Sequence, residues 1–121
     1  MEQSALAQAL ESAISRAEGW AVNGWKVTFG PGNVEVNSLS AARTTPANFV
    51  YRQEAISYWQ NIEMAGVETA AQGRKALEAL SRNDLHAAGN ALYLAVFLEK
   101  KINSGTPTWG PVQALLQKQA A

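Results

Sequence analysis

A helical pattern of apolar residues runs from Pro46 to Leu80 and is the longest regular pattern in the chain. No further proline interrupts it, and Thr45-Pro46 is typical of an N-cap followed by proline in the first helical turn. Gly66 and Gly73 each disfavour a helix interior by ~1 kcal/mol relative to alanine. The pattern therefore predicts either one helix over residues 46–80 or two helices broken near Gly66, and we expect one. Its apolar positions are Phe49, Ile56, Trp59, Ile62, Gly66, Ala70, Gly73, Leu77 and Leu80.

Upstream of this helix the apolar pattern changes to a period of two, which is typical of β-strands. In residues 25–29 and 34–36 apolar side chains alternate with polar ones, and Gly30-Pro31-Gly32 between them supplies the conformational freedom of a tight turn. These features predict a β-hairpin within residues 20–37. Residues 20–22 are a candidate third strand, which would make the hairpin a small meander. Because a two-stranded hairpin is only marginally stable alone, we expect its apolar face to pack on the helices.

Three further helices are predicted from the helical period, over residues 3–18, 84–102 and 109–119. Residues 38–45 are mostly small and polar and are typical of a linker. A short turn joins the predicted helices 46–80 and 84–102, so these two should be antiparallel neighbours. We therefore expect one α+β, mainly α domain over residues 1–121. Its parts are an N-terminal helix, a β-hairpin or small meander, a long antiparallel helical hairpin and a short C-terminal helix.

Small residues occur on both arms of the predicted helical hairpin. Gly66, Ala70 and Gly73 share one face of the first arm. The second arm begins with Ala87, Ala88, Gly89, Ala91 and Ala95. Small side chains let two helix backbones approach closely, so we expect these faces to meet. In an alternative interpretation the glycines leave room for a small ligand or for a second subunit.

Composition argues against several classes of function. Ten basic residues balance ten acidic ones, so the chain lacks the cationic excess expected of a nucleic-acid binder. Because it has no cysteine, it forms no disulfide, zinc ribbon or iron–sulfur cluster. No apolar run approaches the ~18 residues of a membrane span, and the N-terminus lacks the pattern of a signal peptide. We therefore expect a cytoplasmic protein with no membrane partner.

Residues suited to catalysis or metal binding are sparse. His86 is the only histidine, and no motif around it indicates a Ser-His-Asp arrangement. The glutamates show no di-metal spacing, and Gly30-Pro31-Gly32 lacks the Lys-Ser or Lys-Thr of a phosphate loop. We therefore predict no catalytic residue, no metal ligand and no cofactor, and we favour a protein that is not an enzyme. The alternative is a helical nucleic-acid-binding or RNA-processing protein centred on Arg82 and His86, although their spacing departs from the Arg–His motif of helical toxin-like ribonucleases.

Aromatic residues are the candidates for an interaction site. The chain has four tryptophans, and tryptophan and tyrosine both fill cores and anchor protein interfaces. One helix face is too narrow to bury all of Tyr51, Tyr58 and Trp59, so we expect at least one of these rings to be partly exposed or covered by a partner. The candidate interaction residues are Tyr51, Tyr58, Trp59, Trp25 and Trp109. The leading hypothesis is a small non-catalytic protein-interaction module, such as an adaptor, a secretion-type chaperone or an immunity-like inhibitor. Its partner would be another protein or a second copy of the chain.

Overall fold

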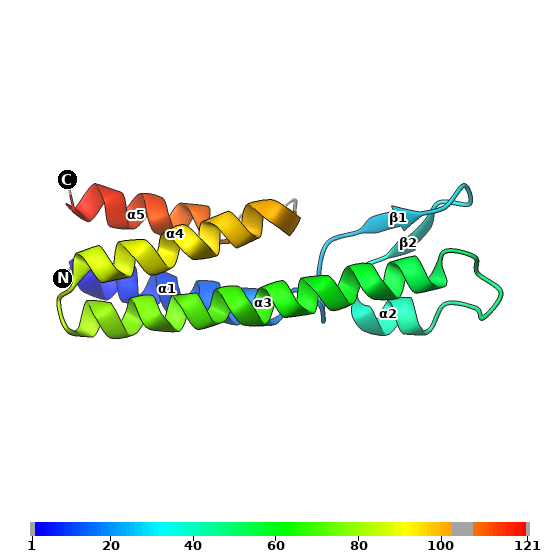
Figure 1. Ribbon diagram of the computed structural model, residues 1–121, viewed down its shortest axis with the longest axis horizontal. Helices are drawn as coiled ribbons and strands as arrows, with labels where there is room; N and C mark the ends of the chain where they lie inside the picture. Colours follow the sequence, from blue (N-terminus) through cyan, green and yellow to red (C-terminus); the bar gives the residue numbers. More distant parts are fainter. Residues whose placement is uncertain (1, 103–107, 121) are drawn as a thin grey trace.

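One long helix, α3 (Arg52–Ser81), runs along most of the length of the protein (Figure 1). The computed structural model describes residues 2–102 and 108–120. The other elements, in chain order, are α1 (Glu2–Glu18), β1 (Val27–Phe29), β2 (Val34–Val36), α2 (Leu39–Arg43), α4 (Leu85–Ile102) and α5 (Gly110–Ala120). Over the described residues the protein is therefore mainly α with one small antiparallel β-hairpin, as the sequence predicts.

The shorter elements fall into two groups along α3. Helices α1, α4 and α5 lie along its C-terminal part, whereas the hairpin and α2 lie along its N-terminal part (Figure 1). Helix α4 packs on α3 and returns antiparallel to it, and α5 packs on both α4 and α1. The C-terminal part of α3 is thus one member of a four-helix bundle, and α4 is the member that follows it directly in the chain.

Helix α3 passes through Gly66 without a break, but it begins at Arg52 rather than at Pro46. The reason lies at Thr45, whose hydroxyl donates to the Ala42 carbonyl at 2.8 Å. This side chain therefore belongs to the end of α2 and does not cap a new helix. The segment between α2 and α3 forms turns instead of a first helical turn.

Two shorter segments also differ from the prediction, each for a local reason. Residues 38–45, expected to be a linker, contain α2, because the Ser38 hydroxyl accepts the Ala41 N–H at 3.0 Å and caps this helix. Residues 20–22 form a turn and not a third strand. The carbonyl of Gly19 accepts the N–H groups three and four residues later, at 3.1 and 3.0 Å, and so extends the end of α1.

The hairpin packs its apolar face on the helices, as expected. Phe29 and Val36 are buried, and the antiparallel register places Val27 opposite Val36. Gly30 is required in the turn for two reasons. Its φ of 72° lies in the left-handed region that favours glycine, and a methyl group there would lie 2.4 Å from the Tyr51 ring.

The glycines of α3 face α1 and the start of α5 rather than α4. A methyl group at Gly66 would lie 2.3 Å from the Ala17 carbonyl oxygen of α1. A methyl group at Gly73 would lie 2.4 Å from the Trp109 ring. The atoms nearest to these two glycines therefore belong to α1 and to Trp109 rather than to α4. The space that they leave is filled by a backbone carbonyl and an indole of the chain itself, and not by a cavity for a ligand.

Candidate functional site

Three of the five predicted interaction residues meet in one aromatic cluster between the hairpin and α3. The Trp25 indole N–H donates to the Tyr58 hydroxyl at 2.7 Å. The centroid of the Trp59 ring lies 5.4 Å from that of Trp25 and 5.2 Å from that of Tyr58. Trp59 is fully buried, whereas Trp25 and Tyr58 are half-buried, which confirms that at least one ring on this part of α3 is partly exposed. The cluster joins the hairpin to α3.

The other two predicted residues, Tyr51 and Trp109, lie apart from this cluster. Tyr51 is half-buried against the hairpin turn, with its ring centroid 6.1 Å from that of Phe49. Trp109 is fully buried just before α5. Near it the buried Glu99 carboxylate accepts the N–H of Thr108 at 2.8 Å and the N–H of Trp109 at 2.7 Å. The structure therefore places Trp109 in the core, where it anchors α5 to the bundle.

One group of exposed apolar side chains lies on α4, and its members were not among the predicted site residues. Tyr93 is 63% exposed, and Leu94 and Phe97 are each 46% exposed. Residues three and four positions apart share a helix face, so these three side chains form one surface, which we call the α4 ridge. Lys101, one turn beyond, places its ammonium nitrogen 4.7 Å from the centroid of the Phe97 ring, within the range of a cation–π contact.

A signal for the α4 ridge was present in the sequence. The apolar residues that recur at helical spacing along one side of this helix are Leu85, Ala88, Leu92, Ala95, Val96 and Ile102. They account for its buried side, so Tyr93, Leu94 and Phe97 are an apolar surplus on the opposite side. Contiguous apolar side chains on the solvent side of a helix are typical of a surface that other structure covers. The apolar residues outside the buried side of this helix, and not only those on it, therefore indicate this surface in the sequence.

A groove lies on each side of the α4 ridge. The groove between α3 and α4 has a volume of about 370 Å³ and is lined in part by the small side chains of Ala79, Ala87 and Ala91, with Leu94 beside them. The groove between α4 and α5 has a volume of about 100 Å³ and is bounded by Tyr93 and Phe97. Helices pack on one another by fitting ridges of side chains into grooves, and the α4 ridge with its two grooves presents this arrangement.

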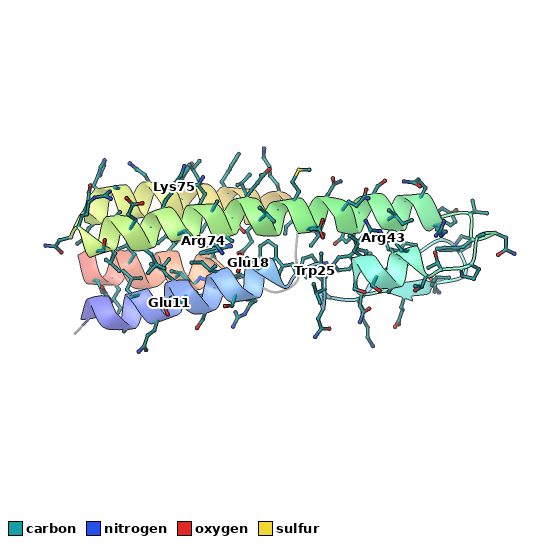
Figure 2. All side chains as sticks on the ribbon, turned by 90° about the horizontal axis from the view of Figure 1, so that it is seen from below. Glu11, Glu18, Trp25, Arg43, Arg74 and Lys75 are labelled. Atoms are coloured by element: carbon teal, nitrogen blue, oxygen red, sulfur yellow. The ribbon has the colours of Figure 1, made fainter. Side chains whose placement is uncertain are left out.

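Lysines surround the α4 ridge. Lys75 lines the groove on the α3 side, Lys100 lines the groove on the α5 side, and Lys101 covers Phe97. Figure 2 shows Lys75 projecting from α3 on the side of α4, whereas the neighbouring Arg74 turns towards α1 and pairs with Glu18. Within the described residues, none of the three lysines forms an ion pair. Their charges are therefore available to a partner.

Arg82 and His86, the centre of the alternative hypothesis, lie at the turn between α3 and α4. The Arg82 guanidinium donates to the Glu78 carboxylate at 2.8 Å, in an exposed pair along α3. The Asp84 carboxylate accepts the Ala87 N–H at 3.0 Å at the start of α4. His86 is exposed on the first turn of α4. The two carboxylates nearest in sequence are thus engaged elsewhere, and nothing in the described part of the chain orients His86 as a general base.

Residues 2–102 and 108–120 present neither a metal site nor a membrane-spanning helix. In these residues no three histidine, aspartate or glutamate side chains gather closely enough to hold a metal ion. No helix among them has the length and apolar character needed to cross a membrane. Comparisons with known proteins give no relative, because no protein-family model, curated protein or solved structure matches the chain. Function must therefore be argued from the surface of the chain itself.

Proposed function

We propose that this protein is a small non-catalytic protein-interaction module that binds its partner through the α4 ridge. The observation that carries the proposal is the exposure of Tyr93, Leu94 and Phe97 side by side on one helix face. Single exposed apolar residues are ordinary on protein surfaces, but contiguous ones rimmed by polar groups are typical of a binding surface.

The composition of the α4 ridge and its rim suits an interface. Tyrosine and phenylalanine are enriched at the centres of interfaces, and polar groups are enriched at their rims. Here the apolar centre is bordered by Asn90 and Gln113 as well as by the lysines. By contrast, Val22 and Val50, which are 76% and 86% exposed, stand in separate turns and each offer one small side chain.

The energy available from the ridge sets a requirement on the partner. Burying a large, fully exposed apolar side chain contributes ~1.5–3 kcal/mol, so covering three partly exposed ones contributes about 3 kcal/mol. Association costs at least ~4 kcal/mol in lost translational and rotational freedom. A stable complex therefore needs the flanking grooves and the rim charges as well as the ridge.

The proposal includes the broader class and location expected from the sequence. An adaptor, a secretion-type chaperone and an immunity-like inhibitor all act by occupying a surface of another protein. Each requires an exposed apolar centre and no catalytic group of its own. We place this activity in the cytoplasm, which fractionation of the source cells would test.

Affinity capture from source cells tests the proposal, with the bound species weighed by native mass spectrometry. Wild-type protein is expected to retain a protein partner in a fixed ratio, and Phe97→Glu is expected to lose it, because a carboxylate at the centre of an interface is desolvated without compensation. Val50→Glu is the matched control, since it also replaces an exposed apolar side chain with glutamate. Retention of the partner by Phe97→Glu, or equal loss with Val50→Glu, would contradict the proposal.

A further inference from the structure

We infer that the partner of the α4 ridge is a second copy of this chain, which docks through an acidic and apolar patch on the outside of α3. This inference rests on the proposed function, because it names the occupant of the same surface. A second group of exposed apolar side chains and the charges around the two groups support it.

The second group lies on α3. Met64 is 59% exposed and Val67 is 60% exposed, and their spacing of three residues places them on one helix face. Glu63 and Glu68 flank them in the sequence and are exposed. Neither glutamate forms an ion pair with any residue that the structure describes. We call these four residues the α3 patch.

The α3 patch and the α4 ridge have the same arrangement with opposite charge. Each has an apolar centre on one helix face, and each is bordered by charges that the described chain leaves unpaired. The border is Glu63 and Glu68 in the patch, and Lys100 and Lys101 beside the ridge. A partner that fits the ridge should present carboxylates around an apolar centre, and the α3 patch does so.

The contact must join two molecules rather than fold one molecule onto itself. Helices α3 and α4 are already packed against each other, and both groups of side chains stay exposed in that packed state, so covering them requires a second molecule. The formal net charge of zero means that no long-range repulsion opposes association of identical copies. Because the two surfaces differ, the contact is heterologous, and repeating it produces a closed ring or an open chain of copies.

Sedimentation velocity on the purified full chain tests the inference. Wild-type protein is expected to form dimers and larger species as its concentration rises, and to form fewer at high salt, which screens exposed charges. The variant Lys100→Glu/Lys101→Glu has two acidic surfaces, and the variant Glu63→Lys/Glu68→Lys has two basic ones. Each is expected to be monomeric alone. An equimolar mixture is expected to associate again, because every acidic surface of one variant then meets a basic surface of the other.

Recovery on mixing also shows that both variants are folded. The matched control is Arg16→Glu/Lys118→Glu, which makes the same change in net charge at two exposed cationic side chains of α1 and α5. Neither forms an ion pair within the described residues, and the variant is expected to keep wild-type association. A monomeric wild type at high concentration, a mixture that stays monomeric, or equal loss in the control would overturn the inference. If the wild type is monomeric but captures another protein through the α4 ridge, the second copy is refuted and the proposed function stands. If the ridge captures neither, both are refuted.

Discussion

Glu99 holds the start of α5 to the last turn of α4, and replacing it should have a large effect on stability. Its buried carboxylate accepts two backbone N–H groups, from Thr108 at 2.8 Å and Trp109 at 2.7 Å. A buried N–H left without an acceptor costs ~1–3 kcal/mol, and a hydrogen bond to a charged acceptor contributes ~1.5–3 kcal/mol. Glu99→Ala leaves two N–H groups without their acceptor, so we expect it to lower the free energy of unfolding by about 4 kcal/mol. Glu99→Gln keeps a neutral acceptor and should lower it by about 2 kcal/mol.

Urea unfolding, followed by tryptophan fluorescence and far-ultraviolet circular dichroism, measures this effect as a lower midpoint at an unchanged slope. Glu11→Ala is the matched control, because Glu11 is an exposed glutamate of α1 that forms no ion pair within the described residues. Its expected change lies within about 0.5 kcal/mol of zero. If Glu99→Ala and Glu11→Ala gave the same midpoint, the anchoring role assigned to Glu99 would be refuted.

Four other single substitutions have defined expected outcomes. Gly66→Ala should destabilise the protein by about 1–3 kcal/mol in urea unfolding, because the added methyl group meets a backbone carbonyl of α1 at 2.3 Å. Gly32→Ala, where a methyl group meets no described atom within 4 Å, should be near neutral. Tyr58→Phe removes the acceptor of the 2.7 Å hydrogen bond from Trp25 and should cost about 1 kcal/mol. A double-mutant cycle with Trp25→Phe should show coupling of similar size, and strict additivity would count against the bond. His86→Ala should change neither stability nor RNA binding measured across a salt series, whereas loss of an RNA signal would favour the nucleic-acid alternative.

The elements that the sequence predicts well are those whose signals are local. Alternation over residues 25–29 and 34–36, with Gly30 between them, is sufficient for a hairpin. The helical period through Gly66 is sufficient for one long helix, even though glycine there costs ~1 kcal/mol. In the folded chain this glycine lets α1 approach α3, and the apolar surface buried between the two helices offsets the cost.

The boundaries around α2 were harder because Ser38 and Thr45 are both plausible caps. In the structure the Ser38 hydroxyl accepts from a later N–H and starts a helix, whereas the Thr45 hydroxyl donates to an earlier carbonyl and ends one. A hydroxyl both donates and accepts, so the sequence alone does not decide between these roles. One such choice moves the start of α3 from residue 46 to residue 52.

The site depends on contacts between distant segments, which periodicity does not reveal. Trp109 is buried in part because Gly73, far away in the sequence, leaves space for its ring. Glu99 is a second residue whose burial depends on a distant segment. A carboxylate in the last turn of a helix interacts unfavourably with the helix dipole, so from the sequence alone this side chain would be expected to be exposed. It is buried because the chain turns back and brings to it the N–H groups of Thr108 and Trp109, just before α5. The α4 ridge, by contrast, was visible as an apolar surplus.

Photo-cross-linking in living source cells decides whether a protein covers the α4 ridge. A photoreactive residue at Asn90, which is exposed and lines the groove beside Leu94, should yield a cross-linked species that contains this chain and a second polypeptide. The same residue at Ser12, which is exposed on α1, should yield none. Cross-links from Asn90 alone that disappear with Phe97→Glu are the predicted result. No cross-link from Asn90, or equal cross-linking from Asn90 and Ser12, would contradict the assignment of the ridge as the docking surface.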